Sequence, residues 1–385
     1  MTGERLRMTV GAHGVSRALG MVMLAGLVVA SCSKRGAEPA PTPEPEQEED
    51  PWTPVFSDQA IRFRTSMDEP STKTALEADF RVFAFYQPGV VGSSTGAWSS
   101  LAWTPNFMYD QEVLYSAGSW SYLPVKYWPN NEENTISFWA YSPHYEAPTP
   151  PATSPVLRLR EYNENTAYGK TTHGLPDIQF TTTPEADQDL FISDLVADQS
   201  YRGGDPADGV VPLVFNHVMC KVDFRVFKKD ADAYNIYLNS LTIEDVLFTN
   251  LYRQGTGWGG GSGDTGDITV YTHVANEAAN LLTDVSVLPP DPLELPEGGR
   301  EIIPIPQSLY ERDAHFHVEY TIQPIADPGT LIPLSCDYYL DQSHRRWQMG
   351  RHYTYTIHIS LGSPILFTAT VTPWKTEQEG FYVID

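Results

Sequence analysis

Two histidines in this sequence have the type and spacing that could begin a metal site. His315 and His317 lie two positions apart in an alternating run, so in a strand both side chains would point to one face, and Glu319 continues that row. Imidazole nitrogens and carboxylate oxygens are zinc ligands. No further cluster at ligand spacing accompanies them. A solvent-facing strand surface is therefore the favoured interpretation, and we predict neither a metal nor another cofactor.

The glycine-rich stretch 255–266 (GTGWGGGSGDTG) has the composition of a phosphate-binding loop. It lacks the Gly-Lys-Ser/Thr ending, and no helical pattern follows it directly, so a flexible hairpin tip is the better interpretation. The chain also contains no His-Glu-x-x-His motif. No pair of carboxylates lies in an apolar setting that would shift its pKa values. We therefore predict that the protein is not an enzyme.

Cysteines and tryptophans leave two further questions open. Cys220 and Cys336 lie in mostly apolar stretches, and they could form a disulfide or remain buried thiols. Five tryptophans crowd one 42-residue stretch, and they could stack on sugar rings or fill the core of a sandwich. Core packing is the favoured interpretation. These tryptophans are Trp98, Trp103, Trp120, Trp128 and Trp139.

The N-terminus carries the pattern of an exported, lipid-anchored protein. Three arginines precede an apolar run at residues 18–31, which is typical of a signal peptide and too short for a comfortable membrane span. The sequence Val-Ala-Ser-Cys at residues 29–32 resembles the lipobox of bacterial lipoproteins. This resemblance implies cleavage after residue 31 and lipidation of Cys32, with a palmitate-type anchor in the cell outer membrane. An ordinary signal peptide with a chance cysteine is the alternative.

A spacer rich in proline and acidic residues follows the predicted anchor at residues 32–51. It contains no large apolar residue over residues 38–50, so it cannot bury enough surface to fold, and we expect an extended tether. The whole chain of 385 residues has 49 acidic and 25 basic residues, a net charge of −24. Residues 1–51 contribute only −2, so the remainder carries −22. Such acidity excludes a basic footprint for nucleic acid.

From residue 52 onward, the dominant hydrophobic period is two, which predicts β-strands. Runs around Val222, Val318 and Tyr355 alternate strictly, as strands with one buried face do. Runs around Val82 and Phe138 are apolar on both faces and predict strands buried on both sides.

The best helical pattern lies at residues 274–284. A Gly-rich polar stretch at residues 201–209 predicts a boundary between two β-sandwich domains, at 52–205 and 206–385.

Several stretches, in their order along the chain, resemble the fimbrillin family of Bacteroidetes lipoproteins. The resemblance implies two tandem transthyretin-like antiparallel β-sandwich domains, surface display, and a role in adhesion as the stalk, anchor or tip subunit of a fimbria. Its partners would be other fimbrillin subunits joined by β-strand addition, with a host glycan or protein as receptor. Besides the lipobox, the matching stretches are residues 71–85, 118–143, 194–227, 347–359 and 365–375.

In this family, a trypsin-like protease removes an N-terminal strand and thereby opens an apolar groove. Ile61, Phe63 and Met67 alternate as such a strand would, and Arg64 and Lys73 are the candidate cleavage points. A strand from the next subunit would fill the groove through main-chain bonds and alternating side chains.

The candidate donor strand lies close to the C-terminus. Ile365, Phe367, Ala369 and Val371 alternate with threonines, as a donor requires. The same pattern fits an ordinary last strand of its own domain, so both interpretations stay open. A second hypothesis for function is an outer-membrane surface lipoprotein that binds glycans through exposed aromatic residues, among them Trp98, Trp103 and Trp120.

Overall fold

The protein is almost entirely β-structure wherever its structure is described. Apart from one short 3₁₀ turn, η1 (Glu297–Gly299), every regular element of the described segments is a β-strand, which confirms the predicted all-β fold class. The computed structural model describes residues 56–67, 78–87, 107–131, 133–144, 155–159, 176–201, 209–229, 233–259, 265–273, 280–282, 291–310, 313–340, 346–360 and 365–374.

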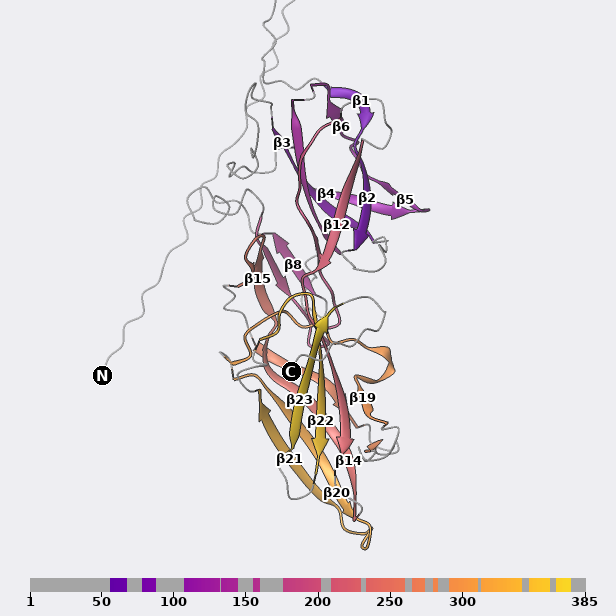
Figure 1. The fold of residues 1–385 in the computed structure, drawn as a ribbon, viewed down its shortest axis with the longest axis vertical. Helices are drawn as coiled ribbons and strands as arrows, with labels where there is room; N and C mark the ends of the chain where they lie inside the picture. Colours follow the sequence, from indigo (N-terminus) through magenta and orange to yellow (C-terminus); the bar gives the residue numbers. More distant parts are fainter. Residues whose placement is uncertain are drawn as a thin grey trace, which may run out of the picture. The chain divides into compact units, whose positions relative to one another are not determined.

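An eight-stranded sheet carries most of the N-terminal half (Figure 1). Its strands follow the order β2–β12–β10–β7–β3–β4–β5, and β11 pairs additionally with β7. These strands are β2 (Arg62–Met67), β3 (Phe80–Gln87), β4 (Met108–Ser116), β5 (Ser119–Ser121), β7 (Thr135–Ser142), β10 (Phe191–Ser193), β11 (Val196–Gln199) and β12 (Val210–His217). A separate pair joins β1 (Phe56–Ala60) to β6 (Tyr127–Pro129).

The two central strands of this sheet, β3 and β7, are buried on both faces, as their apolar runs predict. On one face, Val82 and Phe138 pack in a core with Phe63 of β2 and Phe215 of β12. Tyr122 directly follows β5, and Ile61 directly precedes β2. The Tyr122 hydroxyl donates a hydrogen bond to the Ile61 carbonyl at 2.9 Å. The sheet therefore curls around this core and brings its two ends together.

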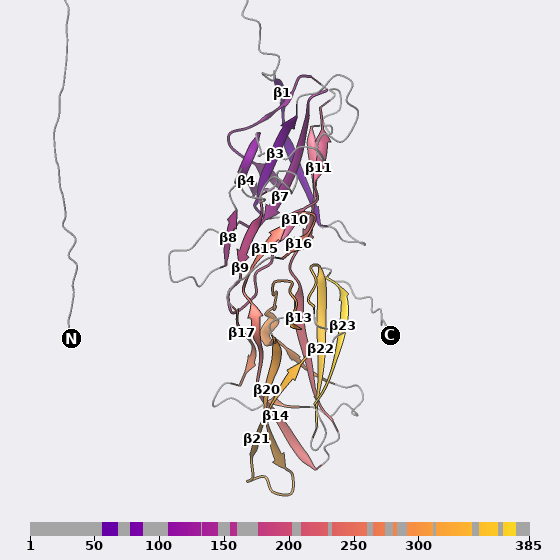
Figure 2. The same ribbon diagram turned by 90° about the vertical axis from the view of Figure 1, so that its left-hand side faces the viewer.

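The other face of β3 and β7 packs against a four-stranded sheet (Figure 2). Phe83 and Trp139 meet Phe180 there, in a core that also includes Tyr252 and Ile305 from later in the chain. Strand pairing thus connects residues near 180 with residues near 250. This sheet has the order β16 (Gly257–Trp258), β15 (Thr249–Arg253), β9 (Ile178–Thr181) and β8 (Val156–Leu159).

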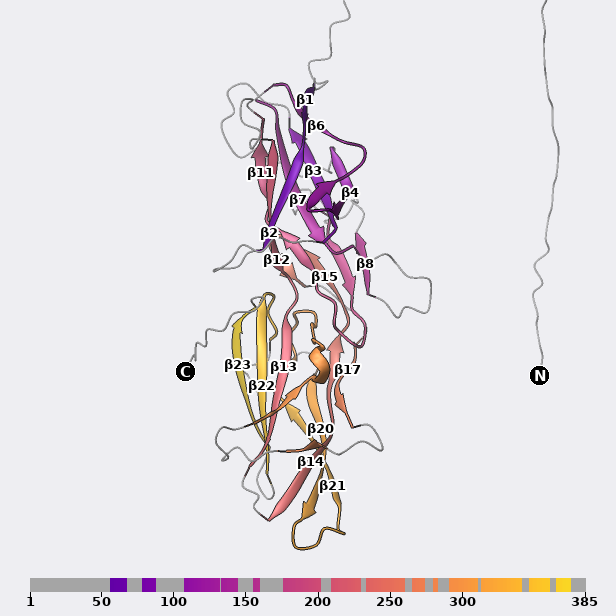
Figure 3. The same cartoon turned by 90° about the vertical axis from the view of Figure 1, so that its right-hand side faces the viewer.

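The C-terminal half contains a sandwich of two sheets (Figure 3). The first sheet has the order β19 (Leu293–Leu295), β13 (Lys221–Lys228), β22 (Arg351–Ile359) and β23 (Leu366–Pro373). The second has the order β17 (Thr265–Thr272), β14 (Tyr234–Leu247), β20 (His315–Pro324) and β21 (Ile332–Tyr339), with β18 (Asn280–Leu281) also paired to β14. Phe224 of β13, Phe316 of β20 and Tyr355 of β22 meet in the core between them.

Burial in this sandwich follows the alternation in the sequence. In β22, Tyr353, Tyr355 and Ile357 are buried and the intervening residues face outward, as one-sided strands should. Two of the described strand pairs, β2 with β12 and β13 with β22, run parallel, which an antiparallel sandwich does not predict. In each parallel pair the partners are separated by a long stretch of chain, as a parallel connection requires.

Strand β12 still belongs to the eight-stranded sheet, and β13 belongs to the C-terminal sandwich. The chain therefore passes from one to the other at residues 218–220. The sequence places the boundary at 205, before β12. The division into domains 52–205 and 206–385 stays a prediction.

The helix predicted for residues 274–284 is wrong at Asn280 and Leu281. These two residues form β18 and pair with Leu238 and Tyr237 of β14. Residues 274–279 and 283–284 lie outside the described part of the chain. Edge pairing with a long strand overrides the helical pattern of a short apolar segment.

Candidate functional site: two edge strands

Strand β2 forms one edge of the eight-stranded sheet and closes its core. It pairs in parallel with β12, from Arg62 opposite Val210 to Met67 opposite Phe215. The side chains of Phe63 and Met67 are buried, as the alternation predicts. The Phe63 ring contacts the Phe80 ring edge-on, with 5.7 Å between ring centroids. Loss of β2 would uncover these aromatic rings and leave one side of β12 without a partner strand.

The two candidate cleavage points have different relations to β2. Arg64 is exposed, but it lies in the middle of β2, opposite Pro212. Its peptide bond is part of a paired strand, so a protease would need the strand to open first. Lys73 lies outside the described residues. In the sequence it follows the end of β2, so a cut after Lys73 would remove the whole strand.

Strand β23 forms the edge of the first sheet of the C-terminal sandwich. It pairs antiparallel with β22, from Leu366 opposite His358 to Pro373 opposite Arg351. Phe367 is buried, and Ile365, Ala369 and Val371 pack half-buried against the same core, whereas Thr368 and Thr370 are exposed. The four candidate donor residues thus share one core-facing side. In this structure β23 is the last strand of its own sheet.

Two aromatic stacks hold β23, one near each end. The Phe367 ring stacks on the Tyr338 ring of β21, with centroids 3.7 Å apart and planes 13° apart. Trp374 directly follows the strand and stacks on the His217 ring, at 4.1 Å and 23°. The Trp374 amide also donates a hydrogen bond to the Gly350 carbonyl at 2.8 Å. Release of β23 therefore requires both stacks to separate.

His217 is held in place by its neighbours at the end of β12. Its Nδ1 lies 2.5 Å from Asp189 Oδ2, and its ring packs against Phe191, with 4.7 Å between ring centroids. Burial raises the pKa of the Asp189 carboxyl. His217 of β12, the strand that borders β2, therefore contacts Trp374, the residue that directly follows β23. Sequence reasoning missed both His217 and Trp374, because neither spacing nor a motif connects them.

The histidine pair on β20 contacts carboxylates from the neighbouring strands. His317 Nδ1 lies 2.6 Å from Asp337 Oδ1, and His315 Nε2 lies 3.3 Å from Glu244 Oε2. The hydrogen bond to Asp337 raises the pKa of His317. Within the described segments, no group of three or more His, Cys, Asp or Glu side chains is arranged to hold a metal ion. The arrangement is a set of cross-strand contacts between histidines and carboxylates. His315 is buried and stacks on Tyr339, so the expectation of a solvent-facing surface is wrong at that residue.

The two cysteines in the described residues are free thiols. Cys220 is fully buried, and its thiol donates to the Pro304 carbonyl at 3.3 Å. Burial raises the pKa of Cys220. Cys336 lies on the edge strand β21, opposite Val318. Of the two possibilities that the sequence left open, the structure has the unpaired thiols.

The tryptophan cluster is mainly core where it is described. Trp128 and Trp139 are buried, and Trp120 packs between Phe80 and Tyr115 at centroid distances of 5.0 and 4.6 Å. Trp98 and Trp103 lie outside the described residues. The described tryptophans of this cluster therefore offer little open ring surface for a sugar.

The remaining predicted features lie partly or wholly outside the described residues. The glycine-rich stretch begins with a tight turn between β15 and β16, where Gly255 has φ 80° and Gly257 has φ 76°; residues 260–264 are not described. Cys32, the signal peptide and the spacer also lie outside. The described part of the chain contains no helix with the length and apolar character that a membrane crossing requires.

Comparisons of the sequence and of the structure with known proteins all find similarity to fimbrial proteins. A family model described as "Fimbrillin-like" matches residues 78–374. The chain is 25% identical over 243 residues to the fimbrium subunit Fim1C of Phocaeicola vulgatus, a match that covers 61% of this chain and 58% of the relative. The chain thus spans somewhat over half the length of that relative.

A solved structure shares the fold. A fimbrial protein from Bacteroides vulgatus ATCC 8482 aligns with a TM-score of 0.59 and 18% identity, covering 82% of this chain and 99% of that one. Strand β23 lies within the residues that the family model matches, whereas β2 lies before them.

Proposed function

Because the chain belongs to the fimbrillin-like family, we propose that it is a structural subunit of a cell-surface fimbria that assembles by β-strand donation and supports adhesion. We propose no enzymatic activity. Before any cut after Lys73, lipidation at Cys32 would tether the protein to the outer membrane, and residues 32–51 would hold the folded part away from it. The partners would be further fimbrial subunits, with a host glycan or protein as receptor. The subunit could serve as stalk, anchor or tip.

Two features together carry the proposal: an N-terminal edge strand that closes a core, and a C-terminal edge strand that buries few side chains. The N-terminal edge strand β2 buries Phe63 and Met67, so its removal would create an apolar groove beside β12. In the C-terminal edge strand β23, only Phe367 is buried, and Thr368 and Thr370 are exposed. A strand of this pattern, taken from one subunit, has the alternation needed to fill such a groove in the next.

Lys73 is the better candidate for the cleavage point, because it follows β2 in the sequence whereas Arg64 lies inside the paired strand. Mass spectrometry of the mature N-terminus from the native host tests this directly. We expect chains that begin at residue 74, together with a heat-labile ladder on a denaturing gel. Lys73→Gln should abolish both, whereas Arg64→Gln should leave both unchanged.

A matched control is Arg158→Gln, which removes an exposed arginine from β8. A chain that retains a lipidated Cys32 and no cut would identify an anchor subunit. Strand donation is refuted if wild-type chains begin at residue 74 and no ladder forms.

The second hypothesis, glycan capture through exposed aromatic residues, gains no support from the described residues. Trp120, the one member of its proposed platform in the described part of the chain, is packed against Phe80 and Tyr115.

A further inference from the structure

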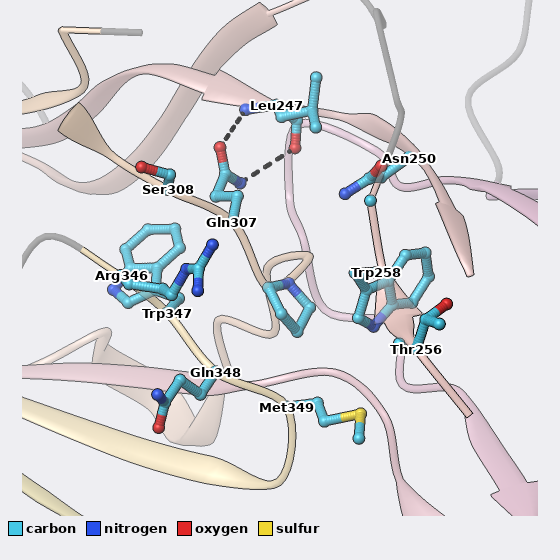
Figure 4. Close-up of a pocket in the computed structure, with 13 residues that line it drawn as sticks. Leu247, Asn250, Thr256, Trp258, Gln307, Ser308, Arg346, Trp347, Gln348 and Met349 are labelled. Carbon is cyan, nitrogen blue, oxygen red and sulfur yellow. Dashed lines mark hydrogen bonds between the residues drawn. The ribbon is translucent and has the colours of Figure 1, made fainter. Parts of the chain in front are cut away.

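A pocket of about 410 Å³ lies between strands β15 and β16 of the four-stranded sheet that packs on β3 and β7 and the segments 306–308 and 346–349 (Figure 4). Its walls come from residues near 250, the turn into β16, and the segments 306–308 and 346–349. This volume lies within the range of small-molecule sites. The floor is buried and the rim is exposed: Asn250 and Trp347 are buried, whereas Arg346, Gln348 and Met349 are open to solvent. None of the residues discussed for strand donation lines the pocket.

Hydrogen bonds fix the floor of this pocket. The Gln307 amide oxygen accepts from the Leu247 amide at 2.7 Å, and the Gln307 amide nitrogen donates to the Ile305 carbonyl at 3.0 Å. The indole nitrogen of Trp347 donates to the Tyr355 hydroxyl at 3.0 Å, and that of Trp258 donates to the Val218 carbonyl at 2.5 Å. The floor is therefore formed before any ligand arrives, which lowers the cost of binding.

The charge of the pocket differs from that of the chain. No acidic residue is among the described residues that line it, and Arg346 is the single ionised one. The chain as a whole has 49 acidic and 25 basic residues. No carboxylate of the described residues lies within ion-pair distance of the Arg346 guanidinium. An arginine fork that no described carboxylate engages is suited to a planar carboxylate of a ligand.

The remaining lining narrows the ligand class further. Thr256, Ser308 and Gln348, which carry hydroxyl or amide groups, are among the lining residues, and the half-buried Trp258 lies across the pocket from Arg346 (Figure 4). A free amino acid would bring an ammonium group, for which the described lining offers no counter-charge. A phosphate group would favour more than one cation. A ring that carries many hydroxyls and one carboxylate satisfies the lining best.

We propose that this pocket binds a carboxylate-bearing sugar, with Arg346 pairing with the carboxylate, the polar rim contacting the hydroxyls and Trp258 packing against the ring. Sialic and uronic acids share this chemistry. The proposal is independent of strand donation, because none of the residues considered for strand donation is among the described residues that line the pocket.

Titration of the purified chain, followed by saturation-transfer NMR and calorimetry, tests the site. The probes are N-acetylneuraminic acid, galacturonic acid, neutral galactose, acetate and a tripeptide with a free C-terminus. We expect at least one acidic sugar to bind with a dissociation constant of about 1 mM, which corresponds to a binding free energy of about −4 kcal/mol. Galactose, acetate and the tripeptide should bind at least about tenfold more weakly.

Variants of Arg346 and of one arginine outside the pocket make the test specific. Arg346→Gln should weaken binding of the acidic sugar by at least about tenfold, and Arg346→Lys should restore it only in part, because lysine lacks the bidentate fork. Arg351→Gln removes an exposed arginine of β22 outside the pocket and should leave binding unchanged. Failure of both acidic sugars to bind, an equal loss in Arg351→Gln, or preferential binding of galactose or the tripeptide would overturn the proposal.

Discussion

At the scale of single residues, the contact between Trp374 and His217 shows how one aromatic pair can tie two strands together. Their rings stack at 4.1 Å, and His217 is itself held by Asp189 and Phe191. Most of β23 outside Phe367 is half-buried or exposed, so this contact forms a large part of what fixes the C-terminal end of the strand.

Trp374→Ala should loosen β23 without unfolding the protein. An aromatic pair contributes about 0.5–1.5 kcal/mol beyond its buried area, so we expect amide hydrogens of residues 366–373 to exchange about 2- to 12-fold faster. Hydrogen-exchange mass spectrometry on the monomer measures this. Trp374→Phe keeps a ring and serves as the control. Equal protection of β23 in the alanine variant and the wild type would show that the stack does not hold the strand.

The His317–Asp337 pair predicts a pH dependence. The folded-state pKa of His317 lies above its value of about 6.5 in the unfolded chain, since Asp337 favours the protonated ring. The pair therefore adds its full stability below that unfolded pKa, and the contribution disappears as the pH rises through the folded pKa. Asp337→Asn should lower the pKa of His317 and reduce stability more at pH 6 than at pH 8.5.

NMR titration of the histidine rings measures the first effect, and urea unfolding at both pH values measures the second. His358 is the internal control, because burial lowers its pKa and Asp337 is not among the causes. An unchanged pKa of His317 in the Asp337→Asn variant would contradict the assignment.

At the scale of elements, β2 and β23 are both edge strands, but they are held differently. Strand β2 buries Phe63 and Met67 in the core of the eight-stranded sheet, whereas β23 buries only Phe367 in the core of its sandwich. Strand β2 is therefore part of the packing of its core, whereas removal of β23 would take fewer buried side chains from its own core.

Phe63→Ala tests how much β2 contributes to its core. The Phe63 ring contacts Phe80, Tyr122 and Phe138, so its loss leaves a cavity and should lower the free energy of unfolding by about 3 kcal/mol. Arg64→Ala, at the next position on the exposed face, should change it by less than about 0.5 kcal/mol. Urea denaturation of both variants provides the comparison. A similar stability for the two would mean that β2 does not close the core.

At the scale of the whole molecule, the net charge of the folded part and the predicted lipid anchor have opposite effects at a membrane. Residues 52–385 carry a net charge of −22, so an anionic membrane surface would repel the folded part. A lipid at Cys32 and an acidic, proline-rich spacer would then be needed to keep the protein at the membrane while holding the folded part away from it.

In the uncut chain, Cys32→Ser should abolish acyl labelling and move the protein from the membrane fraction to the soluble fraction. Metabolic labelling with a palmitate analogue, followed by fractionation, measures both. Cys336→Ser removes a thiol from an edge strand and should change neither. Acyl labelling that persists in the Cys32→Ser variant would place the lipid elsewhere.

Local pattern was enough to predict much of the fold. The alternation around Tyr355 and Val318 correctly predicts one-sided strands, and the apolar runs around Val82 and Phe138 correctly predict strands buried on both sides. These features depend on which side of a strand each residue faces, and a period of two in the sequence specifies that directly. The resemblance to fimbrillins, carried by stretches in a fixed order, likewise needs no coordinates.

Only the tertiary structure decided which strands are neighbours. The parallel pairing of β2 with β12, the stack of Trp374 on His217 and the pocket at Arg346 each join segments that are distant in the sequence. An alternating pattern specifies the buried face of a strand but not its partner or its register, because many alternating strands in one chain could pair equally well by pattern alone. Packing of both halves around shared cores selects one arrangement, and that arrangement places the residues of each candidate site together.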